Sequence, residues 1–317
     1  MCDVNTCTKK TGNGEVAPVN TSINRFNILN MTFYIINSIA TYSVQFGWVD
    51  LPTNGDLSDK YQTIITPFGT SFLIWSVIFM WQLFWAAWQF LPSQRNSEGV
   101  MKAWYYYPIF TVFQAGWTFS FAKEVMWLQL LFMYGLLVTL ISASMSLQTY
   151  KKTWKGYLIW QGPFSIQTGW IMAASCLATN VVPVYYDATA TTRLVVASLC
   201  LATLIVTAFT WLSSYPVDFA IPCVILWALG GVYAELNDPL PAIPEMFSTK
   251  QINGIQYATI AGMALVGTGI IAKALYVLLK QRPKALKAAA VEEKKVNSTT
   301  SESEEASSGK GSIEEEV

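Results

Sequence analysis

The sequence has 317 residues, of which 53% are hydrophobic and 13% charged, and its formal net charge is zero. A soluble domain is about one quarter charged, so this composition excludes an ordinary soluble protein and predicts a polytopic membrane protein. Histidine is absent and the five cysteines lack zinc-like spacing, which excludes His–metal sites, His general bases and His-ligated haem. Without a basic excess, no nucleic-acid partner is expected.

The first 25 residues are polar and lack the apolar run of a signal peptide, so residues 1–25 are predicted to form a cytoplasmic N-terminal segment. Eight apolar stretches follow, each long enough to cross a hydrocarbon core about 30 Å thick as a helix. They cover residues 26–48, 67–91, 105–122, 125–149, 157–182, 193–214, 216–236 and 255–280. They are too long and too uniformly apolar for barrel strands. The predicted fold class is therefore all-α, a polytopic transmembrane helix bundle of about eight spans.

Two of the connections between these stretches are very short. Residues 122–125 read "AKEV" and residues 213–217 read "SSYPV", which leaves little room for a loop. The adjacent charges of Lys123 and Glu124, and the proline at position 216, predict that the chain nevertheless turns at both places.

The charges between the stretches predict the orientation in the membrane. With the N-terminus in the cytoplasm, 15 of the 20 lysines and arginines fall in cytoplasmic segments. The opposite side then carries only Lys60, Lys123, Arg193 and Lys250, together with most of the acidic loop residues. This asymmetry follows the positive-inside rule and predicts that both termini are cytoplasmic. The last segment, residues 285–317, is rich in Ser and Glu and is predicted to be a disordered cytoplasmic tail.

Four tryptophans lie in the uncharged segment "TPFGTSFLIWSVIFMWQLFWAAWQF", residues 66–90. On a helix Trp81, Trp85 and Trp88 fall within about 60° of one another, and Trp75 lies off that stripe. An interfacial belt explains Trp88, whereas Trp81 is too deep in the span for a belt. Two readings remain open for the others: packing between helices, or the lining of a site for a flat apolar ligand.

Three segments resemble the tryptophan-rich sensory protein family, which is related to the translocator protein, or peripheral benzodiazepine receptor, group. The first is "TPFGTSFLIW", with Pro67, Phe72 and Trp75, which resembles the second helix of that family. The second is "FQAGWTFSF", where Gln114 stands in place of the usual Asn. The third is "GPFSIQTGWIMAASCLATN", with a longer distance from tryptophan to asparagine than in five-helix members. A further segment, "VDFAIPCVILWALGG", is similar to longer bacterial members.

The resemblance implies a five-helix core over residues 26–182, followed by three additional transmembrane helices over residues 183–284. It also implies binding of a flat apolar ligand between the helices, of the tetrapyrrole or sterol class, so that a bound porphyrin or sterol is the expected cofactor. We expect the motif-bearing helices to bring six residues to one cavity. These predicted ligand-binding residues are Trp75, Trp81, Gln114, Trp117, Trp170 and Asn180.

Other polar residues in the apolar stretches have two readings. Lys273 could line an ion path or reach the cytoplasmic surface with its long side chain. Asp218 and Glu235 are interpreted as solvated charges at the ends of a span. The amides of Asn37, Gln114 and Asn180 either join helices or orient a ligand.

The leading functional prediction is a membrane receptor, sensor or carrier whose partners are the lipid bilayer and an apolar small molecule; a homodimer stays open. The first alternative is a secondary transporter or channel for a small solute, against which the spans show no inverted repeat and no charged midplane site. The second is an integral-membrane enzyme acting on a lipid or pigment, against which the sequence offers no acid pair and no nucleophile–base set. No metal site and no catalytic residue are predicted.

Overall fold

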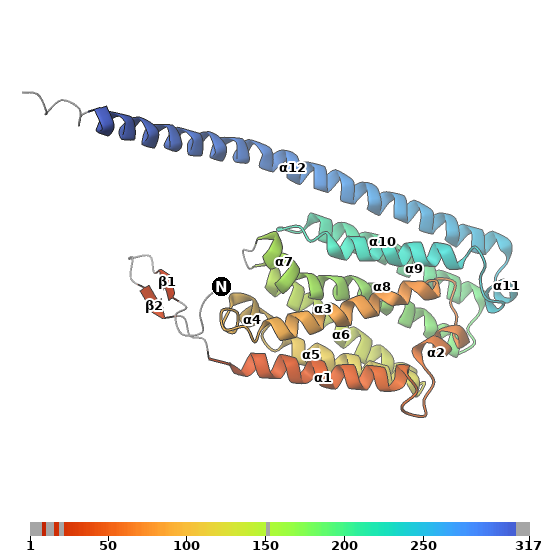
Figure 1. Ribbon diagram of the computed structural model, residues 1–317. Coiled ribbons are helices and arrows are strands. Elements are labelled where there is room, and N and C mark those ends of the chain that lie inside the picture. The colour runs from red at the N-terminus through yellow and green to blue at the C-terminus, as the bar shows by residue number, and fades with distance from the viewer. Residues whose placement is uncertain (1–7, 11–15, 19–21, 150–152, 309–317) are drawn as a thin grey trace, which may run out of the picture. The chain divides into compact units, whose positions relative to one another are not determined.

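The computed structural model describes residues 8–10, 16–18, 22–149 and 153–308, with residues 8–10, 16–18 and 281–308 described by their backbone alone. It is all-α apart from one short antiparallel pair of strands, β1 (Thr8–Lys10) and β2 (Val16–Pro18). The chain divides into two compact units, residues 1–267 and residues 268–317. Figure 1 shows the helices of the first unit, which contains every element discussed below except the later part of α12.

Each predicted apolar stretch contains at least one helix. The elements are α1 (Arg25–Gln45), α2 (Asn54–Lys60), the 3₁₀ turn η1 (Gly69–Leu73), α3 (Ile74–Trp88), α4 (Glu98–Ala103), α5 (Tyr106–Ala122), α6 (Met126–Gln148), α7 (Trp154–Trp160), α8 (Gly162–Tyr185), α9 (Ala190–Ser213), α10 (Ala220–Glu235), α11 (Ala242–Met246) and α12 (Thr249–Ser308). The prediction of an all-α fold is confirmed.

Among the described residues, four helical segments are long and apolar enough to cross a membrane. They are Gly69–Trp88, Met126–Gln148, Ala190–Ser213 and Thr249–Lys280, and Ala220–Glu235 is apolar but shorter. The three other predicted spans, in α1, α5 and α8, are not in this set. The count of eight spans, and the division of the chain at residues 182 and 183, therefore stay predictions.

Buried polar side chains lower the hydropathy of α1, α5 and α8. Asn30 of α1 donates from Nδ2 to Gln89 Oε1 at 2.9 Å, and both side chains are fully enclosed. Gln167 of α8 donates from Nε2 to Gln114 Oε1 of α5 at 2.7 Å. Inside an apolar bundle an unpaired amide is costly, so such pairs fix which helices are neighbours.

α8 is the most enclosed of these helices, and it packs against α3, α6, α7, α9 and α10. Phe164, Trp170 and Ile171 on α8 are each at most 2% exposed. α5 packs between α1 and α6 and contacts α2. The functional side chains described below project from this set of helices toward one another.

Two predicted spans are not continuous α-helices. The fifth breaks at Gln161 into α7 and α8, and Pro163, which lacks a backbone N–H, stands at the start of α8. The second begins with η1, which is joined to α10 where Phe68 N–H donates to the Gly231 carbonyl at 2.9 Å. Gln161, at the first break, is buried, and within η1 the side chain of Ser71 is buried next to α10.

Both short connections turn as predicted. α5 ends at Ala122 and α6 begins at Met126, and Glu124 between them adopts a left-handed φ of 57°. The second turn lies between α9 and α10 and contains a cis Tyr215–Pro216 bond. Charge and proline were therefore sufficient signals for the two turns.

The C-terminal segment is helical over part of the range for which disorder is predicted. α12 continues as far as Ser308, whereas residues 309–317 lie outside the described residues. Ala, Lys and Glu, which are strong helix formers, are frequent in residues 284–295 of this helix. Low apolar content argues against a packed core but does not prevent a helix, and that this tail contributes no core stays a prediction.

Candidate functional site

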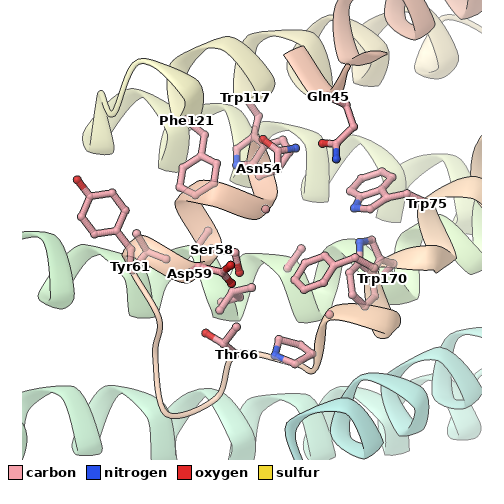
Figure 2. Close-up of a pocket in the computed structure, with 18 of the residues that line it drawn as sticks. Gln45, Asn54, Ser58, Asp59, Tyr61, Thr66, Trp75, Trp117, Phe121 and Trp170 are labelled. Atoms are coloured by element: carbon pink, nitrogen blue, oxygen red, sulfur yellow. The ribbon is translucent and has the colours of Figure 1, made fainter. Parts of the chain in front are cut away.

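A cavity of about 500 Å³ opens between the helices of the first unit. Its walls come from α1, α2, η1, α3, α5, α6, α8 and the last residue of α10. Figure 2 shows the segment that contains α2 crossing this cavity, with Trp75 and Trp170 at one end. Small-molecule sites typically have volumes of about 300 to 1,000 Å³.

Aromatic rings form the apolar part of the cavity. Trp170 receives edge contacts from Phe72, with ring centroids 5.5 Å apart and planes at 86°, and from Trp75, at 6.4 Å and 84°. On another wall Trp117 stacks on Phe121 at 5.6 Å with planes only 13° apart. The arrangement presents flat faces and ring edges from three separate helices, α3, α5 and α8, and from η1.

The indole N–H of Trp170 is a strong donor that is buried in this aromatic group without a partner among the described residues. Trp170 is 2% exposed, and its Nε1 makes no hydrogen bond among the described residues. By contrast, Trp117 Nε1 donates to Gln129 Oε1 at 3.3 Å. A buried N–H without an acceptor costs free energy, so an acceptor on a bound molecule would stabilise the site.

The other end of the cavity is polar and is built by α2 and the chain that follows it. The wall there includes Asn54, Ser58, Asp59, Gln62 and Thr66, and Glu235 reaches it from the end of α10. Gln62 Nε2 donates to Glu235 Oε1, which ties the segment after α2 to α10. Its own oxygen, Gln62 Oε1, is buried and has no partner among the described residues.

Both ends of α2 are fastened. Thr53 caps its first turn and exchanges hydrogen bonds with Asp56, and these bonds lower the pKa of that carboxyl group. At the other end Lys60 Nζ lies 2.7 Å from Glu124 Oε2, and Tyr61 donates its hydroxyl to the same carboxylate. The hydrogen bond from Lys60 is the main cause of a lowered pKa for Glu124.

The middle of α2 is held by apolar packing. Leu57 is 1% exposed and packs with Phe121, Met126 and Val181, and Trp117 is in contact with this cluster. α2 is thus a short helix that covers the cavity and shares Phe121 and Trp117 with its wall.

The structure brings three of the six predicted site residues together at the cavity, namely Trp75, Trp117 and Trp170. Gln114 lies elsewhere and belongs to the buried amide chain with Gln167. Asn180 donates from Nδ2 to the Cys176 carbonyl at 2.9 Å and borders a small separate pocket.

Trp81 also lies away from the cavity. Its Nε1 donates to the Leu158 carbonyl at 2.9 Å, and its ring fills the space that a side chain at Gly162 would occupy. Trp85 is fully buried, with its ring centroid 4.6 Å from that of Tyr107. The stripe of Trp81 and Trp85 therefore serves helix packing, and the off-stripe Trp75 reaches the cavity.

Several lining residues were not predicted from the sequence. Phe72 was part of a recognised motif and could have been included, and Tyr42 and Phe79 had no distinguishing signal. The polar wall from Asn54 to Thr66 depends on a loop folding back over the helices, which no local pattern indicates. Glu235 was interpreted as a solvated end charge, whereas it is half-buried and borders the cavity.

Asp218 also differs from the solvated charge expected from the sequence. It is 0% exposed and accepts hydrogen bonds from Tyr157 at 2.8 Å, from Gln161 at 2.6 Å and from Ser165. These donors join α7, α8 and the start of α10, so the carboxylate connects the two halves of the broken fifth span. Asp218 does not line the cavity, and we interpret it as structural.

The described residues contain no group of three His, Cys, Asp or Glu side chains that could hold a metal ion. The aromatic faces, the Trp170 indole donor and the polar end of the cavity are groups that can bind a molecule non-covalently. A family model described as "TSPO-like protein" matches residues 27–272, which is more than half of the chain. Comparisons with curated proteins and with solved structures give no match. The chain thus belongs to the TSPO-like protein family and is a multi-pass integral membrane protein.

Proposed function

We propose that the protein is a membrane receptor, sensor or carrier that binds a flat apolar molecule of the tetrapyrrole or sterol class in this cavity. The observation that carries the proposal is the aromatic wall around an unpartnered buried donor: Phe72, Trp75 and Trp170, with Trp170 Nε1 free. Family membership supports the ligand class.

The cavity suits such a ligand physically. Burial of a flat ring system against indole and phenyl groups removes apolar area from water, and aromatic pairs add about 0.5 to 1.5 kcal/mol each beyond that burial. The free Trp170 N–H can orient the ligand through one acceptor atom. α2, fastened through Lys60 to Glu124, then keeps water from the bound ring.

The proposed topology places the covered end of the cavity opposite the cytoplasm. α2 lies in the connection after the first predicted span, and with both termini cytoplasmic this connection is on the far side. The five-helix part supplies almost all of the lining, with Glu235 of α10 as the contribution of the later helices. Ligand exchange then occurs from the far side or from the adjoining leaflet.

Ligand titrations with tryptophan variants test the proposal. The protein in lipid nanodiscs is titrated with protoporphyrin dimethyl ester and with a fluorescent sterol, and binding is read from tryptophan quenching. Trp75→Leu and Trp170→Leu keep an apolar side chain but remove the flat face, so each is expected to weaken binding of the preferred ligand about tenfold or more. Trp127→Leu is the matched control, because Trp127 is 66% exposed and does not line the cavity.

Equal affinity in folded Trp75→Leu, Trp170→Leu and Trp127→Leu proteins would contradict the proposal. A fall in melting temperature confined to the two cavity variants, with unchanged affinity, would instead assign these tryptophans to packing.

A further inference from the structure

The fixed charges on the cavity wall are all of one sign. Asp59 at the end of α2 and Glu235 at the end of α10 both border the cavity, and none of the described residues that line it is Lys or Arg. Lys60, next to Asp59 in the sequence, is directed to Glu124 and is not part of the wall. A carboxylate on a ligand would therefore meet only like charge at the polar end.

The neutral polar groups at this end also favour a donor on the ligand. An ionised Glu235 can only accept, so it fixes the amide orientation of Gln62, whose Nε2 donates to it. Gln62 Oε1 is then left as a buried acceptor without a partner, and the Asn54 Oδ1 atom is likewise buried and unpaired. Unpaired buried acceptors are stabilised by a ligand that brings N–H groups.

The aromatic wall acts in the same direction as these acceptors. The faces of Trp, Tyr and Phe rings carry negative potential and attract cations within about 6 Å of the ring centre. Tyr42 and Tyr61 line the cavity together with the indoles and phenyl rings. The carboxylates, the unpaired acceptors and the ring faces therefore all favour the same kind of polar group on the ligand, a cation that donates hydrogen bonds.

We infer that the ligand is a cationic amphiphile, with a flat apolar body against Trp75 and Trp170 and a protonated amine at the Asp59–Glu235 end. The inference rests on the proposed function and specifies its ligand. The cavity is expected to disfavour tetrapyrroles with free propionates and to favour ring systems that carry an ammonium group. An acceptor atom on the apolar body takes the N–H of Trp170.

Three porphyrins that share the same macrocycle and differ in charge test which sign of ligand charge the cavity prefers. They are protoporphyrin with two free propionates, its neutral dimethyl ester, and its bis-amide with terminal quaternary or primary ammonium groups. Binding is measured by tryptophan quenching in nanodiscs of zwitterionic lipid, so that surface potential does not contribute, with empty nanodiscs as the reference for partition. The ammonium derivative is expected to bind at least about tenfold more tightly than the dipropionate, which corresponds to about 1.4 kcal/mol.

Variants that remove the charge of a carboxylate show which residues cause the preference for the ammonium derivative. Asp59→Asn should reduce the ratio between the ammonium and dipropionate affinities several-fold, and adding Glu235→Gln should reduce it further. Because Asp59 is exposed, its amide variant is expected to fold normally. Asp50→Asn and Glu245→Gln are the matched controls, since both carboxylates are exposed and neither lines the cavity.

A failure of the inference about the cation and a failure of the proposed function give different results. If the dipropionate binds as tightly as the ammonium derivative, or if Asp59→Asn leaves the ratio unchanged, the inference about the cation is wrong while the proposed cavity stands. If no porphyrin quenches more than in empty nanodiscs, and the sterol does not bind either, the proposed function itself fails and the inference falls with it.

Discussion

Gly231 on α10 permits the close approach that shapes one wall of the cavity. A Cβ atom at this position would lie 2.9 Å from Pro67 Cβ and closer still to Ser71 Oγ. Its carbonyl accepts from Phe68 N–H at 2.9 Å, so η1 is positioned directly by this residue. Because Pro67 and Phe72 line the cavity, the absence of a side chain at Gly231 is required for the shape of the site.

Gly231→Ala is therefore expected to destabilise the protein and weaken ligand binding together. Overpacking of this kind costs about 1 to 3 kcal/mol, since the neighbours are the ring of Pro67 and the buried side chain of Ser71. The neighbouring Gly230→Ala is the control, because its Cβ would meet only Met263 Cε at 3.8 Å. Melting temperature and porphyrin affinity are measured for both variants; equal behaviour of the two would contradict this role for Gly231.

Gln114 provides a second test at the level of single residues, because the structure separates it from the cavity. Its Oε1 accepts from Gln167 Nε2 at 2.7 Å, and Gln167 in turn is bonded to Gln82. Gln114→Leu leaves the Gln167 donor unpaired, so we expect a loss of about 1 to 3 kcal/mol of stability with little change in ligand affinity.

Trp117, three residues further along α5, should behave in the opposite way. Trp117→Leu is expected to weaken ligand binding more than it lowers the melting temperature, since the ring borders the cavity. Both variants are compared by thermal unfolding in detergent and by titration with the same porphyrin. A Gln114→Leu protein with unchanged stability and weakened binding would return Gln114 to the predicted site.

At the level of elements, α2 controls how the cavity is covered. The Lys60–Glu124 pair is half-exposed, so its contribution to global stability is small. Its local effect is larger, because it holds the end of a seven-residue helix. Glu124→Gln is expected to speed both association and release of the ligand, with a smaller change in the dissociation constant, and to increase hydrogen exchange in residues 54–61. Glu245→Gln serves as the control carboxylate.

The pH dependence of this covering follows from the two lowered pKa values. Glu124 and Asp56 both have a pKa below their usual range, so their hydrogen bonds stabilise α2 fully above the unfolded-state pKa values. That stabilisation is lost as the pH falls through the lower, folded-state values. The protection of the α2 amides, measured as the intrinsic exchange rate at each pH divided by the observed rate, should therefore fall below about pH 4 in the wild type.

The Glu124→Gln variant separates the contribution of Glu124 to the stability of α2 from that of Asp56. In Glu124→Gln the exchange of α2 should already be raised at neutral pH, and only the part due to Asp56 should still respond to acid. A wild-type α2 whose protection factors, corrected for the intrinsic rate at each pH, are the same at pH 7 and pH 3 would contradict the assigned roles of both groups.

The sequence predicted the long elements well and the short ones poorly, for a physical reason. Uniform apolar runs require helices in a membrane, so α6 and α9 could be located to within a few residues. The predicted start of the second span was less accurate, because η1 precedes α3. α2 and the break at Gln161 depend on contacts between distant segments, such as Lys60 with Glu124, that leave no local signature. For the site, the motif residues Trp75, Trp117 and Trp170 line one cavity, and their role in ligand binding stays a prediction. The rotation of Trp81 toward α7 could be known only from packing.

At the level of the whole molecule, the eight-span topology stays a prediction that labelling can test. Cys2 and Cys7 lie in the N-terminal segment, and Asp50→Cys and Ser312→Cys add reporters between α1 and α2 and near the C-terminus. We expect a membrane-impermeant thiol reagent to label position 50 from the non-cytoplasmic side, and positions 2, 7 and 312 only after the membrane is permeabilised. Labelling of position 312 from outside would contradict the even number of spans.

The central claim, that a flat apolar ligand occupies the cavity beneath α2, is tested most directly by photolabelling. A diazirine sterol and a photoreactive porphyrin amide are irradiated with the protein in nanodiscs, and the modified residues are mapped by mass spectrometry. Binding in this cavity predicts adducts on residues 72–79, on residues 170–181 and on α2, all suppressed by an excess of unlabelled ligand. Adducts confined to the exposed faces of α9 and α12, or insensitive to the competitor, would contradict it.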